Sequence, residues 1–315
     1  MLFRAINDED FSNIIADTQK LTSYDGSEYS LLYLKGWDFF NYPSMQIARE
    51  DGVVYLRFKP HDKYDEDEVK NGYIYLPPLC VIDKVKDAYR KIADVCKADK
   101  ENMYVMSTPQ EYVDILGDEY EYVFNQDYSE YLYDPQSLMT YAGKKLHSKR
   151  NHVNNFIKEY RPGEEGDCVL RAYTSEDRDR VLAFDNGWEE SKDFDDKNFD
   201  KMADDEINVI ALALQLVENH DEYFADVIEY RGKIIGFSLG EITPSGVGIT
   251  HIEKGDINYD GVYSYLCQAF AQRHFGEVRV INRQEDMGLE GLRKSKQSYR
   301  PIGFCHKYVV KKACK

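Results

Sequence analysis

Short apolar stretches and longer amphipathic ones alternate along the chain in an order that occurs twice. Period-2 alternation between turn signals predicts strands, and a 3.6-residue period predicts helices. In the first half, an initial strand and helices are followed by predicted strands at 45–49, 53–59 and 73–76, a helix near 83–97, a strand at 103–107, a helix near 109–117 and a strand at 121–125.

The second half repeats this order. The pattern predicts helices near 175–190 and 204–219, strands at 224–230, 233–241 and 248–253, a helix at 261–274, a strand at 277–282, a helix near 288–297 and a strand at 305–310. A repeat of this size predicts two similar α/β domains with mixed sheets, not a solenoid. We expect an N-terminal domain at 1–135, a basic connecting helix at 136–165 and a C-terminal domain at 166–315.

A short sequence echo marks the start of each repeat. Residues 3–10 read FRAINDED and residues 170–177 read LRAYTSED, so Arg, Ala, Glu and Asp recur at the same positions. In the second copy, Thr174 and Asp177 have the spacing of a helix capping box, with Asp in place of Glu. Both copies therefore predict a strand followed by a helix start.

Composition is that of a two-domain globular protein. The chain has 315 residues and 43% hydrophobic residues, enough for two cores, and no apolar run approaches the ~20 residues of a membrane span. The first residues lack the features of a signal peptide. Six cysteines without a CxxC motif indicate reduced thiols and no zinc site. We therefore expect a cytoplasmic protein with no metal and no tightly bound cofactor.

Charge is distributed unevenly along the chain. The net charge is −17, yet residues 143–161 hold six cations and one acid, and residues 291–315 hold eight cations and no acid. The acidic remainder disfavours DNA and other non-specific nucleic-acid binding. The two basic segments predict one anion site if the fold brings them together. The alternative for the second segment is a solvated tail.

The basic segment at 143–160 is also amphipathic. Its apolar stripe consists of Leu146, Val153, Phe156, Ile157 and Tyr160. Lys149 and Arg150 lie on the two edges of that stripe and not on the opposite face. A cation on the packed side of a helix needs an anionic partner, so both residues are expected to line a cleft. The alternative is that both side chains extend past the stripe into water.

The order of elements is that of the GNAT acyltransferases. In that fold a ligand phosphate sits at the N-terminus of the helix after the third meander strand, where free N–H groups favour anions. The corresponding loop here, 253–261, lacks the glycine pattern of acetyl-CoA binders, and Asp256 and Asp260 would repel a pyrophosphate. Ordinary use of acetyl-CoA is therefore disfavoured.

Three blocks carry a resemblance to a known family: GKKLHSKRNHVNNF at 143–156, HIEKGDINYDGVY at 251–263 and VINRQEDMGLEGLRKSKQSYRP at 280–301. Together they resemble the phosphatidylglycerol lysyltransferase C-terminal-domain family, over essentially the whole chain. The resemblance implies a tandem GNAT-like acyl-CoA N-acyltransferase fold. It also implies kinship with the Fem-type peptidyltransferases, which take aminoacyl groups from tRNA. Membrane-bound members append such a domain to a multi-span region, so this chain resembles a stand-alone soluble member.

The candidate catalytic residues are Glu253, Asp286 and Tyr299. By alternation, Ile249, His251 and Glu253 are expected to share one face of a strand. Glu253 is a candidate general base, and Asp286 a second one. Tyr299 matches the family's Lys-x-Ser-Tyr motif and is a candidate proton donor. The alternatives are a cross-strand ion pair for Glu253 and a helix cap for Asp286.

The remaining candidate site residues would bind a substrate or its anionic group. They are Lys149, Arg150, Asn151, Asn154, His251, Lys254, Asn282, Arg293 and Lys296. Arg293 and Lys296 are three residues apart on a predicted helix, which suits a phosphate or an oxyanion. The alternative for Arg293 and Lys296 is that they lie on a solvated helix face. The alternative for His251 is that it is a hydrogen-bonded histidine in the core.

Two functions remain open from the sequence. The first is an acyl- or aminoacyltransferase that moves a group from an anionic carrier, aminoacyl-tRNA or acyl-CoA, to an amine or hydroxyl acceptor. Its partners would be a small-molecule or carrier-bound anionic substrate, with tRNA as a candidate. The second is a non-catalytic module that binds an anionic metabolite or a lipid head group. The chain has no Gly-x-Ser-x-Gly and no Walker loop, which favours direct attack over a covalent enzyme intermediate.

Overall fold

The protein divides into two compact units. The computed structural model describes residues 1–18, 25–39, 45–59, 72–163, 166–190 and 199–313. The first unit consists of 1–130, 285–289 and 304–315, and the second of 131–284 and 290–303. The units are thus not continuous stretches of chain, which differs from the predicted limits 1–135 and 166–315.

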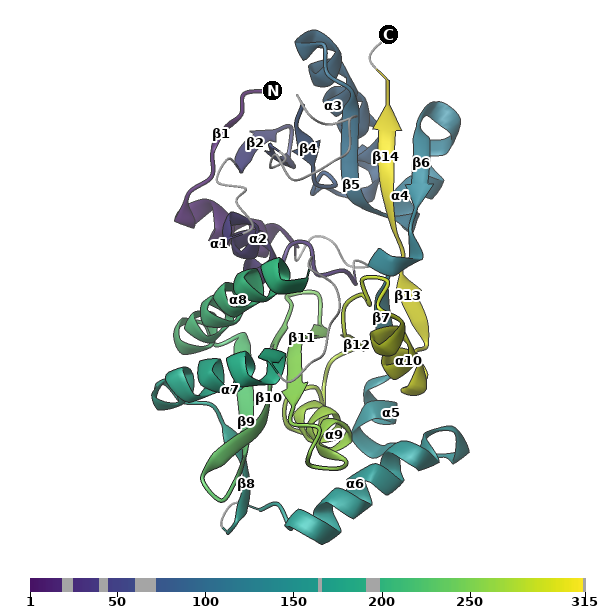
Figure 1. Ribbon diagram of the computed structural model, residues 1–315. Helices are drawn as coiled ribbons and strands as arrows, with labels where there is room; N and C mark the ends of the chain where they lie inside the picture. The colour runs from purple at the N-terminus through teal and green to yellow at the C-terminus, as the bar shows by residue number, and fades with distance from the viewer. Residues whose placement is uncertain (19–24, 40–44, 60–71, 164–165, 191–198, 314–315) are drawn as a thin grey trace. The chain divides into compact units, whose positions relative to one another are not determined.

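The first unit is built on a seven-stranded sheet (Figure 1). Its strand order is β1-β2-β3-β4-β5-β14-β6. The strands are β1 Arg4–Ala5, β2 Gln46–Glu50, β3 Val53–Phe58, β4 Ile74–Tyr75, β5 Met103–Pro109, β6 Glu121–Phe124 and β14 Lys307–Lys312. The helices are α1 Asp8–Thr18, α2 Leu31–Phe39, α3 Val85–Asp99 and α4 Gln110–Leu116.

Strand β14 joins this sheet from the far end of the chain. It pairs antiparallel with β5 on one side and with β6 on the other. Sequence order placed this strand, predicted at 305–310, with the second half of the chain. A local pattern predicts that a strand forms but not which sheet accepts it, because pairing is decided by tertiary contacts.

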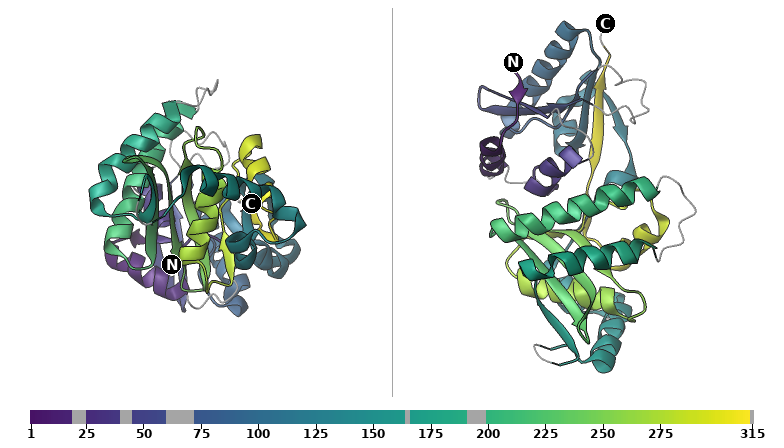
Figure 2. Two further views of the ribbon diagram at one scale, coloured as in Figure 1. Left: turned by 90° about the horizontal axis from the view of Figure 1, so that it is seen from below. Right: turned by 60° about the vertical axis from the view of Figure 1, so that its left-hand side comes forward.

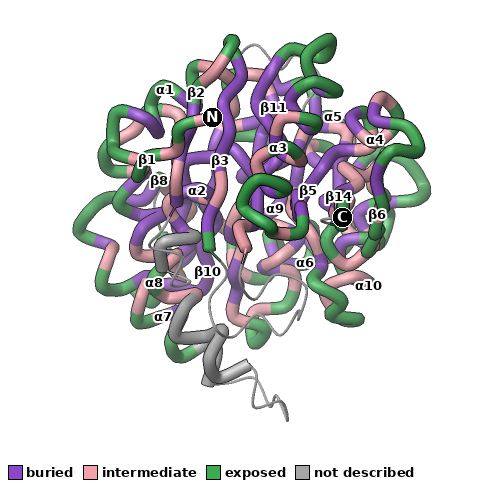
Figure 3. The backbone as a smooth tube through the Cα atoms, turned by 90° about the horizontal axis from the view of Figure 1, so that it is seen from above, coloured by how far each residue is buried: buried purple, intermediate pink, exposed green. Residues whose placement is uncertain are grey.

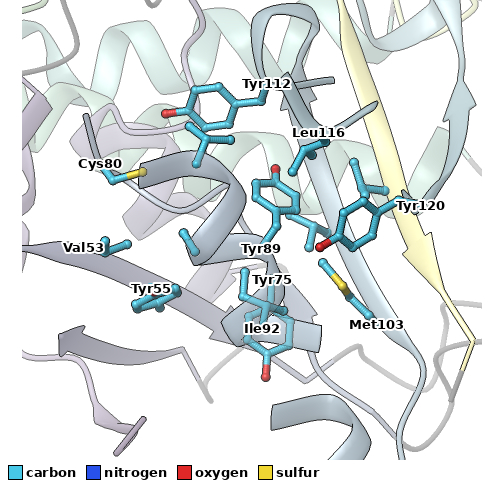
Figure 4. Packing of buried hydrophobic residues seen from close by; sticks show 14 of the residues in the cluster. Val53, Tyr55, Tyr75, Cys80, Tyr89, Ile92, Met103, Tyr112, Leu116 and Tyr120 are labelled. Carbon is cyan, nitrogen blue, oxygen red and sulfur yellow. The ribbon is translucent and has the colours of Figure 1, made fainter. Parts of the chain in front are cut away.

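Tyrosines fill much of the core of the first unit (Figure 4). The Tyr89 ring meets the edges of Tyr112 and Tyr120 at centroid distances of 6.4 and 6.1 Å. After β4 come Pro77 and Pro78, which have no N–H groups to offer an anion. Two positions of this loop therefore cannot donate to a phosphate, unlike the loop that binds a phosphate in a GNAT domain.

The second unit is built on another seven-stranded mixed sheet, in the order β13-β7-β12-β11-β10-β9-β8. The strands are β7 Glu130–Tyr133, β8 Cys168–Ala172, β9 Tyr223–Tyr230, β10 Lys233–Ile242, β11 Val247–Gly255, β12 Val280–Asn282 and β13 Gly303–Cys305. Strand β12 is parallel to β11 and antiparallel to β7. Strand β7 was not predicted.

Helices cover both faces of this sheet (Figure 2). They are α5 Pro135–Thr140, α6 His147–Tyr160, α7 Arg178–Glu190, α8 Phe199–Asn219, α9 Val262–His274 and α10 Glu290–Ser298. Gly236 and Gly240 of β10 let α9 approach closely, since a Cβ there would lie 2.7 Å from Leu266 and 3.0 Å from Phe270. On the other face, Phe237 contacts Phe184 of α7.

The predicted connecting helix is interrupted. Tyr141 and Gly143 have positive φ angles of 46° and 83°, which end α5 before α6 begins. The stripe residues Val153 and Phe156 are buried as predicted, whereas Ile157 is 44% exposed. The capping box at Thr174 and Asp177 is confirmed.

Burial follows the sheets in both units. Figure 3 shows β3, β5 and β11 as mostly buried. Across the described ranges, no helix is both long and apolar enough to span a bilayer.

Candidate functional site

A buried ion pair in the second unit joins two strand ends. Arg283 directly follows β12, and Glu253 lies on the neighbouring strand β11. Arg283 Nη2 donates to Glu253 Oε1 at 2.8 Å, and the two side chains are 10% and 9% exposed. A buried carboxylate and guanidinium of this kind stay charged only because each compensates the other.

Tyr299 brings a second cation to this pair. Its ring, 2% exposed, lies just after α10. Lys149 Nζ from α6 lies 3.6 Å from the ring centroid, and the guanidinium carbon of Arg283 lies 4.6 Å from it. Both cations thus use one aromatic ring as a partner. Among the described residues, the half-buried Lys149 forms no ion pair.

Lys296 supports the backbone that carries Arg283. Its Nζ donates to the carbonyl oxygen of Arg283 at 2.6 Å and to that of Gln284 at 3.1 Å. The Tyr133 hydroxyl donates to the Lys296 carbonyl at 2.8 Å. Gln284 has a positive φ of 54°, a backbone conformation that residues other than glycine seldom adopt. The hydrogen bonds from Lys296 therefore hold an unusual turn in place.

We call Lys149, Glu253, Cys267, Arg283 and Tyr299 the Arg283 cluster. Burial raises the pKa of the Glu253 carboxyl, although the cations of Arg283, Lys149 and Lys296 act in the opposite direction. Burial, and then the charge of Arg283, lowers the pKa of Lys149 to about 8. Burial raises the pKa of the Cys267 thiol on α9 to about 11, so this thiol stays protonated at neutral pH.

One nitrogen of the Arg283 guanidinium is not used by the described residues. Its Nη1 atom is buried and has no hydrogen-bond partner in the described part of the chain. Leaving a buried donor unpaired costs about 1–3 kcal/mol, and more for a charged group. Together with the excess of positive charge around Glu253, this unpaired donor suits an oxygen atom of a ligand.

The prediction that Ile249, His251 and Glu253 share one face is wrong. A β-bulge interrupts the pairing of β11 with β10, since Leu239 pairs with Ile252 but Gly240 pairs with Thr250. The extra residue moves His251 away from the α9 face, where Glu253 lies.

His251 instead forms its own buried network on the other face. Its Nε2 lies 2.9 Å from Glu241 Oε1, and its Nδ1 lies 3.3 Å from Gln284 Nε2. The Tyr223 ring stacks on the imidazole at 6.4 Å. This arrangement fits the alternative of a hydrogen-bonded core histidine.

Lys254 also points away from the cluster. Its ammonium pairs with Asp185 of α7 and lies 3.1 Å from Glu206 of α8. The Lys254 and Asp185 side chains are 5% and 0% exposed. Since α7 covers the face opposite to α9, Lys254 supports the packing of that helix and not the Arg283 cluster.

Of the two predicted edge cations on α6, only Lys149 joins the cluster. Arg150 Nη1 donates to the carbonyl of Tyr141 and, at 3.3 Å, to that of Gly143. Asn151 pairs with His147 on the exposed side, and Asn154 is exposed. Arg150 therefore braces the turn between α5 and α6.

The other predicted residues have local partners or belong elsewhere. The buried Asn282 accepts a hydrogen bond from the Gln284 N–H at 2.7 Å. Asp286 is buried in the first unit, and its carboxylate accepts from the Gly288 N–H at 2.9 Å. Arg293 is half-buried on α10. Ligand-binding roles for Asn282 and Arg293, and a catalytic role for Asp286, stay predictions.

The start of α9, where a GNAT fold binds a phosphate, is in contact with α6. Gly261 has a positive φ of 87°, and a Cβ there would lie 2.4 Å from the His152 carbonyl oxygen and 3.1 Å from Phe156 Cβ. Asp256 in the preceding loop accepts from Asn258 and pairs with Lys233. The position that would receive a pyrophosphate is therefore closely packed and lined by an acid.

Sequence reasoning assigned no role to Arg283 or to Cys267. A signal for Arg283 was present, since it follows a strand end, where α/β sheets place ligands. No sequence signal pointed to Cys267, because a cysteine within the apolar face of a helix is typical of a protein core. In the residues that the structure covers, no group of three or more His, Cys, Asp or Glu side chains could hold a metal ion.

Comparisons with known proteins agree with the predicted architecture. The model of the family described as phosphatidylglycerol lysyltransferase, C-terminal, matches residues 37–311. A conserved protein of unknown function from Bacteroides thetaiotaomicron is similar at 26% identity with a TM-score of 0.83, over 98% of both chains.

More distant structures share the fold. L-PGS from Bacillus licheniformis has a TM-score of 0.64 at 12% identity, over 98% of this chain and 93% of that one. FemX has a TM-score of 0.57 at 9% identity, over 98% of this chain and 97% of that one. The prediction of a mixed α/β, tandem GNAT-like fold is confirmed. With 37–311 matched, the chain belongs to the phosphatidylglycerol lysyltransferase C-terminal family.

Proposed function

We propose that the Arg283 cluster transfers an aminoacyl or acyl group from a carrier to an amine or hydroxyl acceptor. The observation that carries this proposal is the buried Nη1 of Arg283, which no described residue pairs with, beside the ion pair with Glu253. Membership of a family described as a lysyltransferase supports the same class of reaction.

Arg283 suits the stabilisation of an oxyanion. When an acceptor attacks an ester or thioester carbonyl, negative charge develops on the carbonyl oxygen. A fixed N–H donor in a buried site stabilises that charge more than the neutral ground state. Nη2 is held by Glu253 and the backbone by Lys296, so Nη1 needs little reorganisation to bind the oxygen. In this proposal Glu253 orients Arg283.

The donor that the site supports best is an aminoacyl ester carried on tRNA, not acyl-CoA. The contact of His152 with Gly261 and the acid at Asp256 both oppose a pyrophosphate at the start of α9. An ester at the end of a long carrier needs no such loop, because only its terminal group has to reach the cluster.

Transfer of label from two carriers tests the proposal. The purified protein is incubated either with total tRNA charged with radiolabelled amino acids or with radiolabelled acetyl-CoA. A lipid extract and a water-soluble extract serve as separate acceptor pools, and label in each is measured after separation. We expect label to leave the charged tRNA and to appear in one pool.

Variants then connect transfer to the cluster. Arg283→Lys keeps the charge but loses the paired donors, and we expect transfer to fall by about 10²–10³-fold, as for loss of an oxyanion donor. Arg279→Lys is the matched control, since this exposed arginine lies in the same unit and donates to the Ser245 carbonyl. No movement of label from either carrier would favour the non-catalytic binding module instead.

A further inference from the structure

We infer that Lys149 is the general base of the proposed transfer and takes the proton from the attacking acceptor. This inference rests on the proposed function and assigns to α6 a catalytic residue that touches the substrate. It moves the role of base from the carboxylates Glu253 and Asp286 to an amine.

The geometry leaves Lys149 as the available base. Glu253 is engaged by Arg283 Nη2 at 2.8 Å, so its charge is already compensated. Lys149 Nζ lies against the Tyr299 ring at 3.6 Å, and within the described residues no carboxylate pairs with it. An amine without an ion pair loses its proton more readily than one held by a carboxylate.

Charged and titratable groups on four elements face Lys149. They are Arg283 after β12, Glu253 on β11, Cys267 on α9 and Tyr299 after α10. On α6 itself, Arg150 turns to the carbonyls of Tyr141 and Gly143.

The balance of these groups makes Lys149 easier to deprotonate than an ordinary lysine, although the ammonium is still the major form at pH 7. Burial is the larger cause of the lowered pKa of Lys149, Arg283 adds to it, and Cys267 and Glu253 oppose it. At a pKa of about 8, roughly a tenth of Lys149 is neutral at pH 7, against less than about a thousandth of an ordinary lysine. A base with a pKa close to the working pH is the most effective kind.

The transfer step balances without any further reactant. The acceptor nitrogen or oxygen attacks the ester carbon, and its proton moves to the lone pair of Lys149. The carbonyl π electrons move to the oxygen held by Arg283. When the tetrahedral intermediate collapses, the bond to the carrier oxygen breaks, and that oxygen takes the proton back from the Lys149 ammonium.

Competitive labelling tests the titration of Lys149 without any assay of activity. The protein is treated with a trace of deuterated acetic anhydride at a series of pH values, with a blocked lysine peptide in the same tube as reference. Mass spectrometry measures the label on Lys149. We expect half of the limiting reactivity near pH 8. A profile that follows the peptide, with a pKa of about 10.4, would overturn the inference.

Substitutions test the role in transfer. With the donor and acceptor pool of the transfer assay, Lys149→Ala is expected to lower the rate by about 10²–10⁴-fold, and added ethylamine to restore part of it. Lys149→Arg keeps the positive charge but cannot act as a base at neutral pH, so it should stay as slow as the alanine variant. Lys145→Ala and Lys145→Arg, exposed changes just before α6, are the matched controls.

The outcomes separate the inference from the proposed function. Full activity of Lys149→Arg would show that only the charge matters and would refute the base while transfer stands. Unchanged activity of Lys149→Ala, with wild-type thermal unfolding, would refute it too. Failure of the wild-type protein to move label from either carrier would remove the proposed function, and the inference with it.

Discussion

Arg171 holds Asp177 through two hydrogen bonds of 2.6 and 2.7 Å, and the same pair recurs in the first unit. There Arg4 holds Asp10 at 2.5 and 2.7 Å. Each aspartate also accepts from a backbone N–H three residues earlier, that of Thr174 or of Asn7. The recurring Arg and Asp thus tie a strand to the helix that follows it, which explains the short echo in the sequence.

The Asp177 pair predicts part of the acid sensitivity. Its hydrogen bond with Arg171 is the main cause that lowers the pKa of Asp177 to about 2. A lowered pKa adds stability that is present above the unfolded value, near 3.9, and is lost as pH falls through about 2. We expect Asp177→Asn to reduce the free energy of unfolding by about 2 kcal/mol at pH 7 and to flatten its acid dependence.

Urea unfolding at neutral and acidic pH measures both effects. Asp179→Asn, an exposed change in the first turn of α7, two residues after Asp177, is the control and should alter stability by less than about 0.5 kcal/mol. Equal acid dependence in Asp177→Asn and the wild type would contradict this prediction.

Glu253 and Arg283 should move the pKa of Lys149 in opposite directions. Glu253 raises this pKa and Arg283 lowers it. Glu253→Gln should therefore bring it below about 8, and Arg283→Met should bring it above that value. Competitive labelling at a series of pH values measures the shift in each variant. An unchanged pKa in both variants would contradict the prediction and would mean that burial alone sets it.

Loss of Lys254 should destabilise the protein without affecting transfer. Lys254→Met leaves the buried Asp185 without its main cation, which typically costs about 3–5 kcal/mol. Transfer per folded molecule should not change, because Lys254 lies on the face opposite to the Arg283 cluster. Thermal unfolding and the transfer assay check the two parts.

A double variant serves as the control for Lys254. Replacing both charges, Lys254→Met with Asp185→Leu, should recover much of the lost stability, since no charge is left unpaired. A large fall in transfer by folded Lys254→Met would instead restore the predicted role of Lys254 in substrate binding.

Gly261 should tolerate alanine less well than Gly246. Both have positive φ angles, 87° and 78°, but a Cβ meets the His152 carbonyl at 2.4 Å in the first case and nothing within 4 Å in the second. Gly246→Ala should lower the free energy of unfolding by about 1–2 kcal/mol, because alanine is strained in this backbone conformation. Gly261→Ala should lower it clearly more, because α6 must also shift. Equal changes in unfolding free energy would show that α6 packs loosely on α9.

Local patterns predicted most of the helices and strands but not their pairing. Strand order within a sheet depends on contacts between distant residues, so the place of β14 could not be derived from its alternation. The tyrosine-rich β7 has only four residues, Glu130–Tyr133, too few for a clear period.

The candidate site was predicted in part for a similar reason. Lys149 was found from its place at the edge of an apolar stripe, and Glu253 from its place on a strand. Arg150 was expected to line the same cleft as Lys149. It instead binds backbone carbonyls that the turn at Tyr141 exposes. The expectation for His251 failed at a one-residue bulge, which no alternation rule foresees.

The place of β14 has a consequence for biosynthesis. A ribosome makes β5 and β6 early, but the strand that belongs between them appears only after the whole second unit has been made. At about 5–20 residues per second, the nascent first unit waits on the order of ten seconds with two open strand edges. Such edges invite pairing with other chains. The sheet of the first unit is therefore completed only after the other strands of both units have been made.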